Sequence, residues 1–100
     1  MELMLSVKYT AKPGRREEFV GKIVAQGILD AIRAEEGCLQ YEYYFSTDRE
    51  DEVLLLEKWA SEAHQRAHMT QPHMAQLRAI KEECIAGVTL KQLQEEDYAL

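Results

Sequence analysis

Cys38-Leu-Gln-Tyr-Glu-Tyr-Tyr-Phe-Ser46 and Glu52-Val-Leu-Leu-Leu-Glu-Lys-Trp59 are two β-rich runs, separated by the polar segment Thr47-Asp-Arg-Glu-Asp51. Two such runs joined by a short polar loop predict a β-hairpin. Large apolar side chains occupy both faces of this hairpin, and the helices of so small a chain cover only one face of a sheet. Because an exposed apolar sheet face usually marks an interface, we expect a homodimer packed sheet to sheet.

Before the hairpin, alternating apolar residues predict a strand over residues 3–10. Apolar residues at three- and four-residue spacing then predict one long helix from Arg15 to about Glu35. Gly27, one of two glycines inside this helix, weakens it by up to about 1 kcal/mol relative to alanine. Gly37 suits the left-handed position that ends a helix.

After the hairpin, Ser61 can cap a helix over residues 62–69, and Pro72 interrupts it before a further helix that reaches about Glu83. A last strand is predicted over residues 85–93. The order βαββαβ predicts a fold of the α+β class. We expect the ferredoxin-like split βαβ arrangement, with an antiparallel four-stranded sheet and helices on one face.

The length of 100 residues and the even composition predict one domain, over residues 2–93, followed by an acidic C-terminal tail, over residues 94–100. The net charge of −6 disfavours nucleic acids and anionic membrane surfaces as partners, since both require a basic patch. The acidic start and the lack of any apolar run near the ~20 residues of a membrane span predict a cytoplasmic protein. Cys38 and Cys84, without a CxxC motif, are expected as thiols.

The three histidines and the single tryptophan of the chain lie between Trp59 and His73. Histidine changes protonation near neutral pH, so this cluster is the best candidate site. His64 and His68 have the spacing of a zinc-binding HExxH motif, but Gln65 replaces its glutamate. We therefore favour a site without a metal, and we expect His64 on the exposed face of its helix.

His68 and His73 are the stronger candidates for catalysis. Pro72 suits the first turn of a helix, which places His73 at the positive end of the helix dipole, where a charged imidazolium is disfavoured. A neutral imidazole is the form that a general base requires. The alternative is that His73 only caps the helix or binds backbone.

Glu57 lies on the same strand face as Leu55 and Trp59, so this face carries a carboxylate among large apolar groups. An unpaired buried charge is costly, so Glu57 needs a partner such as a histidine, or a wet cavity. An exposed edge position or a salt bridge is the alternative. Trp59 can be part of the core or the wall of a ligand pocket. No glycine-rich phosphate loop occurs in the sequence, which predicts no nucleotide cofactor.

Three segments carry a family resemblance: Glu35-Glu-Gly-Cys38, Leu56-Glu-Lys-Trp59, and Ala67-His68 followed by Pro72-His73-Met74. They resemble the antibiotic biosynthesis monooxygenase (ABM) domain family, most of all its small quinol monooxygenase branch. The resemblance spans about residues 3–92 and implies a dimeric α+β barrel with a pocket between sheet and helices in each subunit. It further implies oxygenation of a quinol or polycyclic phenol by O2 without flavin, haem or metal.

The resemblance also implies roles for single residues. His68 and His73 match the His-x4-His element of the quinol branch, so one of them would be the catalytic base, with Glu57 orienting it. Trp59 matches the tryptophan of the antibiotic-pathway members and would form a wall of the pocket. Leu55 stands where those members have an asparagine, which argues against transferring their substrates. The other predicted pocket residues are Leu55 itself, Met74 and Tyr41.

Two other functions stay open at the level of sequence. Relatives that share the His-x4-His pattern isomerise a small phosphorylated signalling ketone, although this chain has no obvious cationic cluster that would anchor a phosphate. A binding protein for aromatic ligands, without turnover, would need neither histidine.

Overall fold

Four strands form one antiparallel sheet in the computed structural model, which describes residues 1–99. The strands are β1 (Leu3–Ala11), β2 (Cys38–Phe45), β3 (Glu52–Trp59) and β4 (Ile85–Leu93). Their order across the sheet is β2-β3-β1-β4, so β1 and β3 lie in the centre. The predicted hairpin and the predicted ferredoxin-like α+β fold are confirmed.

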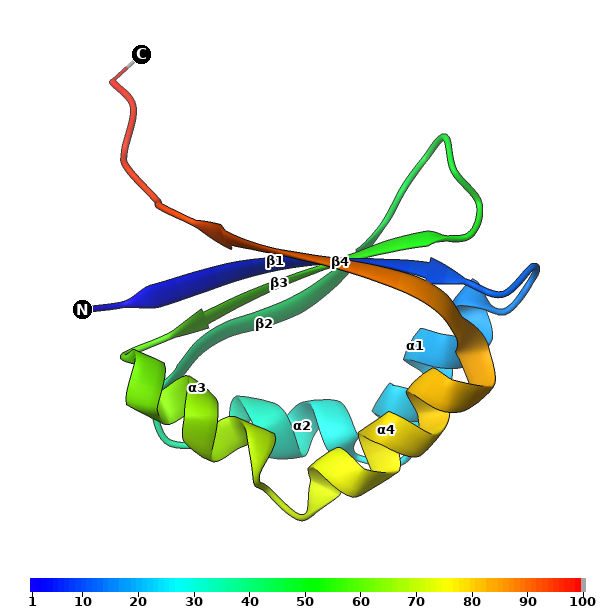
Figure 1. The fold of residues 1–100 in the computed structure, drawn as a ribbon, viewed down its shortest axis with the longest axis horizontal. Helices are drawn as coiled ribbons and strands as arrows, with labels where there is room; N and C mark the ends of the chain where they lie inside the picture. Colours follow the sequence, from blue (N-terminus) through cyan, green and yellow to red (C-terminus); the bar gives the residue numbers. More distant parts are fainter. Residues whose placement is uncertain (100) are drawn as a thin grey trace.

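All four helices lie against the same face of this sheet (Figure 1). They are α1 (Arg16–Ala25), α2 (Ile28–Arg33), α3 (Glu62–Met69) and α4 (His73–Cys84). α3 begins as predicted after Ser61, whose hydroxyl accepts a hydrogen bond of 3.2 Å from the backbone N–H of His64. No helix within residues 1–99 is long and apolar enough to cross a membrane.

The single long helix predicted from Arg15 to about Glu35 is wrong. The first helix ends at Ala25 and a new one begins at Ile28, because Gly27 between them has a left-handed conformation with φ +74°. The break redirects the chain, so that both short helices bury side chains against the sheet. These buried side chains are Phe19, Ile23, Ile28 and Ile32. Val24, which a continuous apolar stripe would bury, is 54% exposed.

The register of β3 shows which residues lie on the inner face of the sheet, meaning the face that meets the helices. Glu57 pairs with Leu5 of β1 on one side and with Tyr41 of β2 on the other. Residues two apart on a strand share a face, and every second residue of β3 from Val53 to Trp59 is buried. The prediction that Glu57 shares a face with large apolar groups is therefore confirmed.

Beyond β4, residues 94–99 form neither helix nor strand and are exposed. Glu95 in this segment pairs with Lys58 of β3, with 2.6 Å between its Oε1 and the lysine Nζ. Leu100, the last residue of the predicted acidic tail, lies outside the described residues.

The turn between α2 and β2 is packed tightly at Gly37. Its φ of +81° is the left-handed conformation predicted for this glycine. A Cβ atom at this position would lie 2.3 Å from Cγ of His64 in α3. The backbone carbonyl of Gly37 also accepts a hydrogen bond of 2.8 Å from the N–H of Ala60. The turn is thereby held against the end of β3 and against α3, close to the helices that carry the histidines.

We expect Gly37→Ala to lower the free energy of unfolding more than Gly27→Ala does. Both glycines have positive φ, a conformation that costs an alanine about 1–2 kcal/mol. Only at Gly37 does the added methyl group also collide with another side chain, and such overpacking costs about 1–3 kcal/mol more. Urea denaturation of both variants, followed by circular dichroism, measures the difference. Equal losses would contradict the packing of Gly37 against His64.

Candidate active site

One carboxylate joins the two histidines that the sequence favours. Oε2 of Glu35 lies 3.0 Å from Nδ1 of His68 and 2.7 Å from Nε2 of His73. The side chains of Glu35, His68 and His73 are 8%, 2% and 18% exposed, so the cluster is largely removed from water and His73 is its most accessible member. A carboxylate oxygen accepts hydrogen bonds, so the contacts select the tautomers in which His68 carries its proton on Nδ1 and His73 on Nε2. In that tautomer, Nε2 of His68 carries the lone pair.

Three elements position this cluster. Glu35 follows α2 in the turn at Gly37, and its backbone N–H bonds to the carbonyl of Ile32 at 3.0 Å. His68 lies in the last turn of α3, and His73 is the first residue of α4. The prediction that Pro72 places His73 at a helix N-terminus is therefore confirmed.

His68 also packs against two aromatic side chains of the sheet. The centroid of its ring lies 4.6 Å from that of Trp59 on β3, at an interplanar angle of 33°. The Tyr41 ring of β2 lies 5.6 Å away, at 61°. His68 therefore connects the Glu35 carboxylate to an aromatic surface inside the protein.

The hydrogen-bond partner of Glu57 is Trp59, whereas the sequence analysis suggested a histidine. Glu57 is 6% exposed, and its Oε1 accepts a hydrogen bond of 2.9 Å from the indole N–H of Trp59. Burial raises the pKa of Glu57, and the hydrogen bond from Trp59 offsets this only in part. The carboxylate that lies within hydrogen-bond distance of the histidines is Glu35, whereas the hydrogen bond of Glu57 is with the indole of Trp59.

Glu35 is the site residue that the sequence analysis missed. Glu35 and Glu36 are adjacent and chemically identical, and both were interpreted as the end of a helix. The structure turns Glu35 inward, whereas the side chain of Glu36 is 95% exposed. The available signal was the segment Glu35-Glu-Gly-Cys38, which carries part of the family resemblance.

His64 lies apart from the other two histidines and is half-buried, which corrects the expectation of an exposed side chain. Its Nδ1 lies 2.7 Å from the hydroxyl oxygen of Ser61, and its ring covers Gly37. The prediction treated His64 as one position on an isolated helix. The tightly packed Gly37 turn is what shields it from solvent.

The predicted pocket residues all belong to the buried core around the cluster. They are Leu55, Trp59, Tyr41 and Met74. Further along the inner face, Tyr43 is close to Tyr41, with 5.9 Å between ring centroids. The hydroxyl of Tyr43 is buried, and the neighbouring phenol of Tyr41 is the group that acts on it most directly. Burial raises the pKa values of Tyr9, Tyr41 and Tyr43, so these phenols stay neutral at physiological pH.

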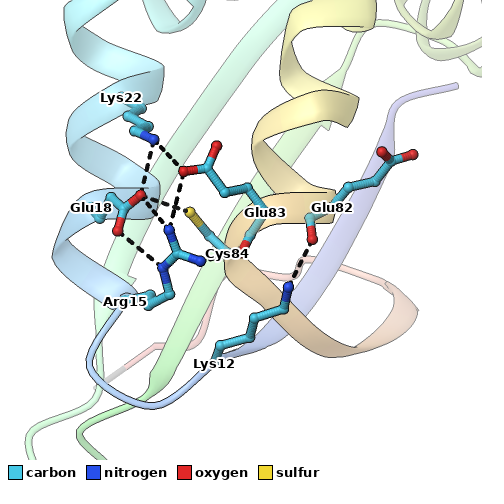
Figure 2. Close-up of polar contacts among 7 residues, drawn as sticks. All are labelled: Lys12, Arg15, Glu18, Lys22, Glu82, Glu83 and Cys84. Atoms are coloured by element: carbon cyan, nitrogen blue, oxygen red, sulfur yellow. Dashed lines mark hydrogen bonds and ion pairs between the residues drawn. The ribbon is translucent and has the colours of Figure 1, made fainter.

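A second group of titratable side chains lies at the far end of α4 (Figure 2). Glu18 of α1 and Glu83 of α4 share the cations Arg15 and Lys22, with contacts of 2.5–3.1 Å. The hydrogen bonds from Arg15 and Lys22 lower the pKa of Glu18 to about 2. The thiol of Cys84 lies beside this carboxylate, and burial raises its pKa. Because the cations neutralise both carboxylates, we interpret this group as an ion-pair cluster that joins α1 to α4.

We expect Glu57→Gln to raise the free energy of unfolding at pH 7, because the amide oxygen still accepts the Trp59 N–H while the buried charge is removed. The pKa of Glu57 is higher in the folded protein than its ordinary value of 4.5. The free energy of unfolding therefore falls as the pH rises from 4.5 through the pKa of the folded state. The gain of the variant should therefore be larger at pH 7 than at pH 4. Glu57→Leu leaves the indole N–H without an acceptor and should be about 1–3 kcal/mol less stable than Glu57→Gln. Urea denaturation at both pH values measures these differences, and a larger gain at pH 4 would contradict the argument.

Comparisons with known proteins agree with the fold and with the family resemblance. The sequence matches the family model described as antibiotic biosynthesis monooxygenase over residues 3–80. Over 71 residues it is 35% identical to the Bacillus subtilis (strain 168) protein named "Putative monooxygenase YcnE", a match that covers 71% of this chain and 73% of that protein.

Two solved structures show the same fold. PA3566 from Pseudomonas aeruginosa is similar with a TM-score of 0.83 and 26% identity, over 96% of this chain and 95% of that chain. Rv0793 from Mycobacterium tuberculosis has a TM-score of 0.82 and 26% identity, with 100% of both chains covered. The match of the family model and the identity to the Bacillus relative confirm the resemblance seen in the sequence, and this chain belongs to the antibiotic biosynthesis monooxygenase family.

Proposed function

We propose that this protein is a cofactor-independent monooxygenase that oxidises a quinol or polycyclic phenol with O2. The observation that carries the proposal is the buried His68 imidazole, which Glu35 holds by Nδ1 while its ring packs against Trp59 and Tyr41. A base oriented by a carboxylate beside aromatic side chains suits removal of a proton from a phenol. The family supports the reaction class at the level of a monooxygenase.

In the proposed reaction, Nε2 of His68 takes the proton of a substrate hydroxyl. The imidazolium that forms is stabilised by the Glu35 carboxylate, in the way that a buried carboxylate supports histidine in hydrolases. The electron-rich substrate anion then passes an electron to O2, and the two radicals combine at a ring carbon to form a peroxide. Cleavage of the O–O bond leaves a carbonyl on the ring and releases water, whose proton His68 returns. A hydroquinone and O2 thus give a hydroxylated quinone and water, with all electrons supplied by the substrate.

His68 is favoured over His73 as the base. It is the more deeply buried of the two and packs against both Trp59 and Tyr41. His73 shares the Glu35 oxygen from the more exposed side and would help to hold the carboxylate in place. Exclusion of water by the surrounding core would protect the radical and peroxide intermediates.

Oxygen uptake by metal-stripped protein with a panel of hydroquinones tests this proposal. We expect His68→Ala to lower kcat about 100-fold or more, the usual contribution of a general base. Glu35→Gln should lower kcat at least about tenfold with little change in KM, because it acts through His68 and not on substrate binding. Glu36→Gln changes the neighbouring exposed glutamate and is the matched control, with uptake expected to equal that of the wild type.

Oxygen uptake that survives in His68→Ala would contradict the proposed base, and uptake that survives there but is lost in His73→Ala would assign that role to His73. Binding of the hydroquinones without uptake in any variant would instead support the aromatic-ligand binding protein. Isomerisation without oxygen consumption would support the alternative enzyme class.

We further propose that the active form is a homodimer in which two sheets pack by their outer faces, the faces opposite the helices. No helix within residues 1–99 covers this face (Figure 1). Leu54 and Leu56 of β3 are its central apolar residues; Leu54 pairs with Tyr44 of β2, and Leu56 pairs with Glu42 of β2 and Ser6 of β1. Charges of both signs surround that centre, including the Lys8–Glu52 pair. A face with an apolar centre and both signs of charge is complementary to a two-fold related copy of itself, so a second copy is the partner that it fits.

Sedimentation equilibrium at micromolar concentration tests the dimer. We expect the wild type to sediment as a dimer and Leu56→Lys as a monomer, because the substitution places an unpaired charge at the centre of the interface. Val24→Lys makes the same kind of change at an exposed apolar residue on the helix side and should leave the dimer intact. A monomeric wild type, or equal dissociation of both variants, would contradict an interface through the outer face.

A further inference from the structure

The proposed base is closed off from substrates in this structure. The side chain of His68 is almost fully buried, and so are the rings of Trp59 and Tyr41 against which it packs. Side chains with so little accessible surface border neither solvent nor a cavity that could hold a substrate ring. An element around His68 must therefore move before a substrate can reach it.

The helix that carries His68 has the fewest buried side chains of the four. Among residues 62–69 only His68 is buried, and Met69, the one large apolar side chain of α3, is 49% exposed. The next helix, α4, is anchored in the core by four buried side chains, which are Met74, Leu77, Ile80 and Cys84. Elements that bury few apolar groups open at a small cost in free energy while the rest of the molecule stays folded.

Both ends of α3 are attached to fixed parts of the fold. Before the helix, the N–H of Ala60 donates a hydrogen bond of 2.8 Å to the carbonyl of Gly37. After the helix, residues 70–72 lead into α4, whose second residue, Met74, lies in the core. α3 itself lies at one end of the helix layer (Figure 1). It can therefore tilt away from the sheet about Ser61 and residues 70–72, with the sheet and α4 left in place.

The two histidines of the cluster lie on opposite sides of such a movement. Oε2 of Glu35 contacts Nδ1 of His68 on α3 and Nε2 of His73 on α4. When α3 tilts away, only the contact with His68 breaks, and His73 keeps the carboxylate in position. Glu35 then marks the place to which His68 returns, in the orientation that the reaction requires.

His64 supplies a second contact that holds α3 closed. Its half-buried ring lies directly against Gly37, in the turn that carries Glu35. The start of the helix does not depend on this ring, because the hydroxyl of Ser61 bonds to the backbone N–H of residue 64. Loss of the imidazole should therefore weaken the closed position of α3 and leave the helix formed.

We propose that α3 is a lid that carries the base of the reaction, so that it tilts away from the sheet to admit the substrate and closes by returning His68 to Glu35. This inference rests on the proposed function, because it takes His68 as the group that meets the substrate. In the open state, Trp59 and Tyr41 lose the imidazole that covers them and offer a stacking surface to an aromatic ring. Closure over that ring brings His68 to a substrate hydroxyl and excludes water.

The accessibility of His68 tests the lid without any substrate. Diethyl pyrocarbonate modifies the imidazoles that it can reach, and mass spectrometry of peptides gives the rate at each histidine. We expect His64→Ala to raise the modification rate of His68 at least about fivefold, because it removes the contact with Gly37. Arg66→Ala changes an exposed residue of the same helix and should leave that rate unchanged. Ile80→Val lowers the global stability from within α4 and should leave it unchanged as well.

Anaerobic binding of 1,4-dihydroxynaphthalene connects the lid to the substrate. Trp59 is the only tryptophan of the chain, so the quenching of its fluorescence in a stopped-flow instrument reports arrival at the site. Association is limited by the fraction of molecules that are open. We expect the association rate to rise in His64→Ala by the same factor as the modification rate of His68, and Arg66→Ala to match the wild type.

The outcomes separate the lid from the proposed reaction. Faster modification of His68 in His64→Ala, with no oxygen uptake on any hydroquinone, would support the lid and refute the monooxygenase. An unchanged rate in His64→Ala, or equal acceleration in Arg66→Ala or Ile80→Val, would overturn the lid whatever the oxygen assay gives. Association that stays the same while the modification of His68 accelerates would overturn the entry of substrate through this movement.

Discussion

The Glu35 carboxylate connects parts of the chain that are distant in sequence: the turn after α2, the end of α3 and the start of α4. Its oxygen accepts from two imidazoles in a site that is largely removed from water. Removal of any one of the three side chains would leave buried polar atoms without partners, which is more costly than the bond itself is stabilising. The same contacts hold His68 against Trp59 and Tyr41, so the geometry of the aromatic site depends on this carboxylate.

The inner face of the sheet combines a packed core with polar groups that are not fully partnered. One oxygen of Glu57 accepts the hydrogen bond from Trp59, and Lys81 has no direct counter-ion among the described residues. Such groups cost stability, and their concentration in one region points to function. The ion-pair cluster at Glu18 and Glu83 shows the contrast, because its charges are partnered and partly exposed, as expected of a structural contact.

Local sequence patterns were sufficient where one short-range rule controlled the outcome. The hairpin, the helix start after Pro72 and the strand over residues 85–93 follow from alternation, the geometry of proline and turn composition, and all three are present. The long helix over residues 15–35 was a failure of the same reasoning. Apolar spacing continues through Gly27, whereas this left-handed glycine separates two helices. The spacing of apolar residues shows which side chains can be buried, but it does not show whether they belong to one continuous helix.

The sequence by itself determined the positions of the four strands, the inward face of β3 with Glu57 and Trp59, and the family to which the chain belongs. Tertiary structure alone decided which carboxylate meets the histidines. Glu35 lies 33 residues from His68 and 38 from His73, and it reaches both because the Gly37 turn packs against α3. Glu36, with the same chemistry one position later, points to solvent. Hydrogen bonds over such separations depend on the path of the backbone between their partners, which no local pattern of residues encodes.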